Sequence, residues 1–244
     1  MMKWIVARVN LGSGVLLLLL TACAVTESPS ITNSLSPGTA WVAQSPEWIQ
    51  EADQVYMEAH DYLERAHVSY AGGHWYVVLD VDETILNNVA YQIERDLRGE
   101  SFSASSWYAW TQKEAATAVP GSLAFLKAVA DLGGKVALVT NRRDVEQLAT
   151  ENNLAALGLI RGRDFQVLLT RGAGSSSNKD NRFGIVPQLL EVQGYEDARA
   201  LAYLGDGKGD KPSDRATDST WQFFCIDQGA MYGDFCAEVP RTGR

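Results

Sequence analysis

The sequence has little positive charge and no cluster of basic residues. Its 244 residues include 21 Lys and Arg against 30 Asp and Glu, a formal net charge of −9. A nucleic-acid polymer as partner is excluded, because backbone binding needs a basic face. A small phosphorylated molecule is not excluded, since one pocket can be positive on an acidic protein. There is no internal repeat, and 46% hydrophobic content at this length predicts one sizeable domain with short additions.

The N-terminal apolar run is too short to cross a bilayer. Val15 to Leu20 follows the basic residues Lys3 and Arg8, which predicts a secretory signal over residues 1–22 that takes no part in the fold. The segment ends in Leu20-Thr21-Ala22-Cys23, which resembles a bacterial lipobox, where the leader is cut and the cysteine receives lipid. An ordinary secretory signal with an incidental cysteine is the alternative.

Lipid on Cys23 would anchor the protein in a bacterial membrane. Each CH₂ group buried in the bilayer contributes about 0.8 kcal/mol to membrane binding. Several acyl chains would therefore anchor the protein firmly, whereas a single chain would anchor it only marginally. Ala24 follows the cysteine. By resemblance to Gram-negative lipoproteins, this favours the outer membrane, with the domain facing the periplasm or the cell surface.

Cysteine is scarce, with two residues besides Cys23. Export would place Cys225 and Cys236 in an oxidising compartment where thiols pair, and we predict a disulfide between them. Two free buried thiols are the alternative, because the sequence does not show whether the Cα atoms lie within bridging distance.

Residues 23–44 predict a flexible tether, because Val25 to Gln44 is rich in small and polar residues with little periodicity. We expect the folded domain at residues 45–244. It would begin at Ser45-Pro46-Glu47, which combines an N-cap, a Pro at the first helical position and an acid in the first turn. Apolar residues then recur at helical spacing to about His67.

Apolar strands and helical segments alternate in the rest of the chain. This alternation indicates an α/β fold, a largely parallel sheet with helices on both faces. A small cap over the strand ends is expected at residues 92–118, with a helix at residues 107–116. The expected strands are Trp75–Leu79, Lys135–Val139, Phe165–Leu169, Ala200–Leu204 and Trp221–Ile226.

Carboxylates follow the first of these strands directly. Asp80 and Asp82 are two residues apart, so in a continuing strand both would point to one face. Like charges that close resist joint ionisation unless a cation lies between them, and oxygen ligands favour Mg²⁺. A solvated acidic turn is the alternative for this segment alone.

Residues after four strands can meet in one crevice, because ligands of such sheets bind beyond the carboxyl ends of the strands. Asp80, Thr140, Lys179 and Asp206 are the residues concerned, and together they predict a phosphoryl-transfer site. Asp80 would attack phosphorus to give an aspartyl-phosphate. Asp82 would protonate the leaving oxygen and later activate water.

The remaining residues would hold the metal and the phosphate. Asp80 and Asp206 would bind Mg²⁺ with support from Asp210. Thr140 and the backbone N–H groups from Asn141 onward would hold phosphate oxygens, with Lys179 as the fixed positive charge.

Four motifs carry a family resemblance that runs from about Trp48 to Asp234. They are Val78 to Asn88 with Tyr91, Val139 to Asp144, Lys179 with Arg182-Phe183, and Gly205-Asp206 with Asp210. With these motifs the chain resembles the haloacid dehalogenase (HAD) superfamily, and within it the class C bacterial acid phosphatases and 5'-nucleotidases of the outer-membrane lipoprotein e type.

The resemblance implies a Rossmann-like three-layer sandwich with a small, mostly helical cap, and an acid pH optimum. It also implies that Asp82 offers the metal its backbone carbonyl and that Trp107 and Tyr232 stack on a nucleobase. Ordinary core packing is the alternative for these two aromatic residues.

The chain departs from the family after Asp206. Gly207-Lys208-Gly209 stands where Asn-Leu is common, and Lys211 where Phe is common. The spacing from Asp206 to Asp210 is kept, so the metal role is still expected.

The sequence therefore predicts a magnesium-dependent phosphomonoesterase of the cell envelope that acts on small monoesters, with nucleoside 5'-monophosphates as the leading class. One alternative is an acid phosphatase of broad specificity without nucleotide preference. Another is a surface lipoprotein that binds a ligand without turnover. The oligomeric state stays open, with a homodimer as the candidate.

Overall fold

The computed structural model describes residues 34–70, 72–213, 220–229, 231, 232 and 236. All of these residues belong to one compact unit. The predicted leader, the predicted lipidation site Cys23 and most of the predicted tether lie outside the described residues. No helix in the described part of the chain has the length and apolar character needed to cross a membrane.

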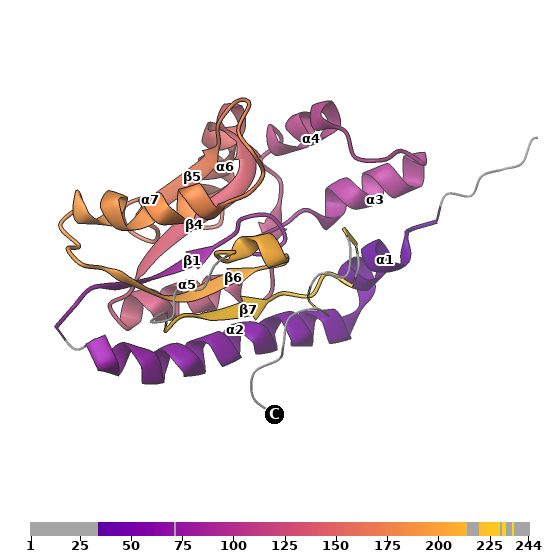
Figure 1. Ribbon diagram of the computed structural model, residues 1–244. Helices are drawn as coiled ribbons and strands as arrows, with labels where there is room; N and C mark the ends of the chain where they lie inside the picture. Colours follow the sequence, from indigo (N-terminus) through magenta and orange to yellow (C-terminus); the bar gives the residue numbers. More distant parts are fainter. Residues whose placement is uncertain (1–33, 71, 214–219, 230, 233–235, 237–244) are drawn as a thin grey trace, which may run out of the picture. The chain divides into compact units, whose positions relative to one another are not determined.

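A five-stranded sheet lies at the centre of this unit (Figure 1). Its order is β5-β4-β1-β6-β7, and all neighbouring strands are parallel. This confirms the predicted α/β fold. The strands are β1 (Trp75–Leu79), β4 (Lys135–Arg143), β5 (Val167–Arg171), β6 (Arg199–Gly205) and β7 (Gln222–Cys225).

The register of β1 places its last residue between β4 and β6. Leu79 pairs with Leu138 of β4 on one side and with Leu204 of β6 on the other. Residues that follow these positions therefore emerge at the same edge of the sheet.

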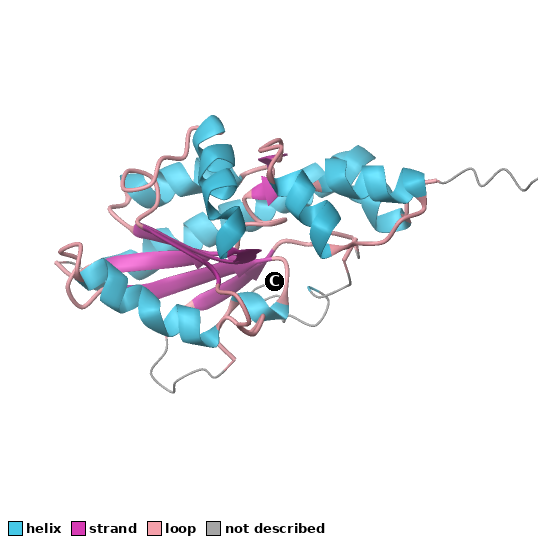
Figure 2. Ribbon diagram, turned by 90° about the horizontal axis from the view of Figure 1, so that it is seen from above, coloured by secondary structure: helices cyan, strands magenta, loops and turns pink. Residues whose placement is uncertain are grey.

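Helices cover both faces of the sheet, as Figure 2 shows from above. Val77 and Leu79 of β1 pack into one hydrophobic cluster, while Tyr76 and Val78 pack into another on the opposite face. The first cluster includes residues of α2 (Pro46–Ala66), α5 (Ser122–Asp131) and α6 (Gln147–Ala156). The second includes residues of α7 (Asp180–Glu191). Short 3₁₀ helices are η1 (His67–Tyr70), η2 (Asp144–Glu146) and η3 (Lys208–Asp210).

A small cap joins β1 to α5. Its two helices are α3 (Val89–Arg98) and α4 (Ala104–Thr111), and β2 (Leu86–Asn87) pairs with β3 (Thr117–Ala118) in an antiparallel ribbon at its base. The cap thus begins before the predicted residue 92. The helix predicted at residues 107–116 is wrong in its bounds, because Ser103 and Ser106 form a capping box that starts α4 at Ala104.

The tether prediction is wrong for residues 37–44, which form the helix α1 (Pro37–Gln44). Ser36 caps α1 through a hydrogen bond from Thr39 N, and its own backbone N donates to Asp96 Oδ2 of α3 at 2.7 Å. Val42 is buried in the core. Ser36-Pro37 is the same start signal that Ser45-Pro46 provides for α2, but the short helix has too little apolar periodicity to stand out.

The predicted disulfide between Cys225 and Cys236 is present. The two Cα atoms are 5.6 Å apart. It ties the end of β7 to the C-terminal segment.

Removal of α1 should destabilise the domain. A chain that begins at Ser45 loses the burial of Val42 and the hydrogen bond between Ser36 and Asp96. One buried valine side chain contributes about 1.5–3 kcal/mol. Urea denaturation should therefore give a free energy of unfolding at least about 2 kcal/mol below that of a chain that begins at Ser34. Equal values would show that α1 is not part of the fold.

Reduction of the disulfide should also destabilise the domain. The bond closes a short loop, with a sequence separation of 11, so the chain-entropy model gives at most about 3 kcal/mol. Dithiothreitol should lower the urea midpoint of the chain that begins at Ser34. The double variant Cys225→Ala/Cys236→Ala should already unfold at that lower midpoint and should not respond to dithiothreitol.

Candidate active site

Three carboxylates gather around one ammonium group at the carboxyl edge of the sheet. Asp80 follows β1, Asp206 follows β6, and Asp210 ends η3. One oxygen from each lies within 4.8 Å of the others. Lys179 Nζ donates to Asp80 Oδ1 and to Asp210 Oδ1, both at 2.6 Å. Lys179, Asp80 and Asp210 are 3%, 9% and 6% exposed, so these charges meet away from bulk water.

The turn after β6 brings Asp210 back to the strand end. Gly207 N donates to Asp210 Oδ2 at 2.8 Å. Gly205 has no room for a side chain, because a Cβ there would clash with the side chain of Asp210. The glycines around Asp206 therefore allow two carboxylates four residues apart to join one group.

An excess of negative charge follows from this arrangement. Burial raises the pKa of Asp80 to about 7, with Asp210 and Asp82 adding to the shift and Lys179 opposing it. Burial, Asp210 and Asp80 likewise raise the pKa of Asp206. For Lys179, burial acts to lower the pKa, but the two carboxylates outweigh it and raise the pKa to about 12. One ammonium does not balance three carboxylates.

The residues present fit a divalent metal ion. Asp80, Asp206 and Asp210 offer carboxylate oxygens, the donors that hard cations such as Mg²⁺ take, and a cation would offset the excess charge. Asp82 was predicted to contribute its backbone carbonyl. Its side chain does not belong to the group of three.

The carboxylate of Asp82 is held by two side chains. Arg142 donates to Asp82 Oδ1 from Nη2 at 2.7 Å and from Nε at 2.9 Å. Asn88 Nδ2 donates to the same oxygen at 2.9 Å. The Arg142 side chain is 1% exposed and the Asp82 side chain 20% exposed, so the arginine is buried while the carboxylate keeps some contact with solvent.

Sequence reasoning gave no role to Arg142 or Asn88. Both lie in the motifs that carry the family resemblance. The signal that was overlooked is the spacing in β4, where Arg142 is two residues from Thr140 and so shares its face of the strand.

Thr140 and Asn141, predicted to bind phosphate, lie at the end of β4. Thr140 is fully buried, and its Oγ1 accepts a hydrogen bond from Arg142 N at 3.1 Å. Arg182 of α7 donates to the carbonyl oxygen of Thr140 and, at 2.6 Å, to Asn141 Oδ1. The sequence motif places Arg182 beside Lys179, and the structure shows that Arg182 ties α7 to the end of β4.

The two aromatic residues predicted to stack on substrate come from distant parts of the chain. Trp107 of α4 is half-buried, packs edge-on against Tyr91 at 5.1 Å between ring centroids, and has the Arg142 guanidinium 5.7 Å from its ring centroid. Tyr232 is 36% exposed. Burial raises the pKa of its hydroxyl, and Glu83, Asp82 and Asp206 raise it further, so Tyr232 lies near the acidic residues.

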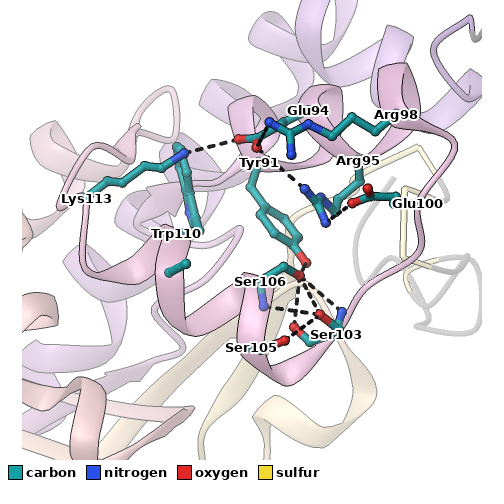
Figure 3. Close-up of a pocket in the computed structure, with 11 residues that line it drawn as sticks. Tyr91, Glu94, Arg95, Arg98, Glu100, Ser103, Ser105, Ser106, Trp110 and Lys113 are labelled. Carbon is teal, nitrogen blue, oxygen red and sulfur yellow. Dashed lines mark hydrogen bonds and ion pairs between the residues drawn. The ribbon is translucent and has the colours of Figure 1, made fainter.

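A separate cavity of about 480 Å³ lies between α3 and α4 (Figure 3). Its charged residues pair with one another, as in the ion pairs of Glu94 with Arg98 and Lys113 and of Arg95 with Glu100. None of the four aspartates lines it, so it is not the candidate active site. Tyr91 and Trp110 lie in its wall.

Matches to known proteins point to acid phosphatases. Residues 21–196 match the family model described as HAD superfamily, subfamily IIIB (acid phosphatase). The chain is similar to "Acid phosphatase 1" of Solanum lycopersicum, with 28% identity over 152 residues. That match spans 58% of this chain and 58% of the tomato protein.

Two solved structures share the fold. The class C acid phosphatase from Bacillus anthracis gives a TM-score of 0.66 at 23% identity. The same enzyme with tungstate bound gives 0.65 at 22%. Each match covers 80% of this chain and 84% of the other.

Loss of Lys179 should destabilise the metal-free domain. Lys179→Met leaves Asp80 and Asp210 without their ammonium partner, and breaking a buried ion pair in this way costs about 3–5 kcal/mol. Urea denaturation in excess chelator measures the loss. Lys127→Met is the control, because Lys127 pairs with Asp131 on the exposed face of α5 and should have little effect. Equal stability of the two variants would contradict the assigned charge balance.

Proposed function

The chain belongs to the acid phosphatases of HAD superfamily subfamily IIIB, and on this premise we propose that it is a magnesium-dependent phosphomonoesterase that acts through an aspartyl-phosphate. The observation that carries the proposal is the group at the sheet edge. A buried carboxylate, a buried lysine bonded to it and two further carboxylates meet at the ends of parallel strands.

Asp80 is the nucleophile. Lys179 holds Oδ1, so Oδ2 is the oxygen assigned to attack phosphorus. In the first step the Asp80–phosphorus bond forms as the bond from phosphorus to the leaving oxygen breaks. In the second, water attacks the same phosphorus and releases inorganic phosphate with recovery of the carboxylate. Two steps replace one difficult hydrolysis.

Asp82 moves the proton in both steps. It gives a proton to the leaving oxygen and then takes one from the attacking water. Its position two residues after the nucleophile supports this role, as does its fixed orientation between Arg142 and Asn88.

Lys179, Thr140 and Asn141 bind the phosphoryl oxygens. An ammonium has three N–H donors, and two of those on Lys179 are used by Asp80 and Asp210, so one is left for phosphate. Arg182 binds Oδ1 of Asn141, which directs the Nδ2 donors of that amide the other way. Asp80, Asp206 and Asp210 would hold Mg²⁺, which when bound supplies positive charge to stabilise the transition state.

Nucleoside 5'-monophosphates are the proposed substrate class. Trp107 and Tyr232 support it, because a half-buried and a partly exposed aromatic ring near the acidic residues offer faces for a nucleobase. The resemblance of Leu20-Thr21-Ala22-Cys23 to a lipobox supports a lipid-anchored enzyme of the bacterial cell envelope.

The test is turnover of phosphomonoesters by the soluble chain that begins after Cys23. With Mg²⁺, Asp80→Asn should lower kcat by at least about 10³-fold, because an amide does not replace the nucleophile. Chelator should abolish the activity of the unsubstituted protein, and Mg²⁺ should restore it. Asp131→Asn, on an exposed helix face, is the matched control and should keep full activity.

Each outcome bears on one part of the proposal. Equal turnover by the unsubstituted chain and Asp80→Asn would remove Asp80 as nucleophile. No hydrolysis of any monoester would favour the ligand-binding alternative. Equal kcat/KM for nucleoside and simple aryl monophosphates would remove the nucleotide preference and leave a phosphatase of broad specificity.

A further inference from the structure

The buried amide of Asn88 lies between the cap and Asp82. Its Oδ1 accepts hydrogen bonds from Trp110 Nε1 of α4 at 2.8 Å and from Arg142 Nη2 at 3.3 Å. Its Nδ2 donates to Asp82 Oδ1 at 2.9 Å and to the carbonyl oxygen of Leu86 at 3.2 Å. All hydrogen-bonding positions of this side chain are thus engaged, and the residue is fully buried.

The orientation of this amide is set by its neighbours. The indole of Trp110 and the guanidinium of Arg142 are donors only, so the amide oxygen must face them. The amide nitrogen must then face Asp82. The reverse orientation would place an oxygen against the Asp82 carboxylate and an NH₂ group against two donors, which leaves buried polar groups unsatisfied.

Two routes, each a chain of side-chain contacts, connect the cap to Asp82. One runs from Trp110 through Asn88 to the carboxylate. The other runs from Trp107, whose ring lies against the Arg142 guanidinium, through the ion pair of Arg142 with Asp82. Thr150 Oγ1 accepts from Arg142 Nη1 at 3.2 Å, which fixes the arginine from the other side. Asp82 therefore has its orientation set by side chains that contact one helix of the cap.

We propose that Trp110 is a positioning residue for Asp82: its indole N–H fixes the Asn88 amide, and that amide together with Arg142 aligns the carboxylate that transfers protons. This rests on the function proposed above. Trp110 is 6% exposed and its Nε1 donates to Asn88, whose amide in turn donates to Asp82, so Trp110 acts on the carboxylate through Asn88.

Misalignment of a proton donor has a specific kinetic consequence. An alkyl phosphate must release an alkoxide unless the leaving oxygen is protonated, whereas 4-nitrophenolate leaves readily without a proton. General acid catalysis contributes about 10²–10⁴-fold where it is needed. A residue that only supports the fold would affect both substrates equally, because each reports the same amount of active protein.

The experiment compares kcat/KM for glycerol 3-phosphate and for 4-nitrophenyl phosphate on the same preparation. The ratio of the two does not depend on the fraction of folded enzyme. Trp110→Phe keeps an aromatic ring but removes the N–H donor, and it should lower the alkyl-to-aryl ratio by about tenfold, part of the full general-acid contribution. Tyr108→Phe is the control on the same helix, where the tyrosine is exposed, and should leave the ratio unchanged.

A double variant tests the route. Asn88→Leu should lower the ratio as well, and Trp110→Phe/Asn88→Leu should lower it no further than Asn88→Leu alone, because both changes interrupt one chain of contacts. If the double variant lowered the alkyl-to-aryl ratio by the product of the two single effects, the route through Asn88 would be overturned. If Trp110→Phe lowered kcat/KM equally for both substrates, the positioning role would be overturned. Turnover by the unsubstituted protein would in that case still support a phosphatase. No turnover by the unsubstituted protein would overturn the proposed function and this inference together.

Discussion

The arrangement of this site depends on one buried cation, Lys179. Its ammonium group bonds two carboxylates that the fold delivers from different strand ends. Burial of several like charges is unfavourable, and the lysine offsets only part of that cost. The remaining negative charge is what a divalent cation would offset, so the imbalance that destabilises the protein without a metal would favour the binding of one.

The parallel sheet explains why residues more than a hundred positions apart form one group. Register in β1, β4 and β6 is fixed by apolar pairs such as Leu79 with Leu138 and Leu204, and polar residues begin within two positions after these pairs. The core therefore sets the geometry of the site. The cap adds a second layer of control, because its tryptophans contact the side chains that hold Asp82.

The sequence allowed the five strands of the sheet, the main helices between them and the gathering of Asp80, Lys179, Asp206 and Asp210 to be predicted. Each of these four residues follows a strand or lies at the start of a helix, where the residue pattern has a physical meaning. It did not reveal the partners of Asp82. From the sequence, Arg142 is one more cation next to the residues predicted to bind phosphate. In the structure β4 extends to Arg143, and the side chain of Arg142 therefore points toward Asp82. The start of the fold was also misplaced, since α1 is too short for periodicity to reveal and is held by contacts with distant residues such as Asp96 and Met231.

The early start of the fold has a consequence for the lipid anchor proposed at Cys23. Ser36, which bonds to the cap residue Asp96, is the thirteenth residue after Cys23. A fully extended chain spans at most about 3.6 Å per residue, so this segment reaches no more than roughly 47 Å. With the proposed lipid on Cys23, Ser36 and the cap residue Asp96 that it contacts would lie no farther than that from the bilayer surface.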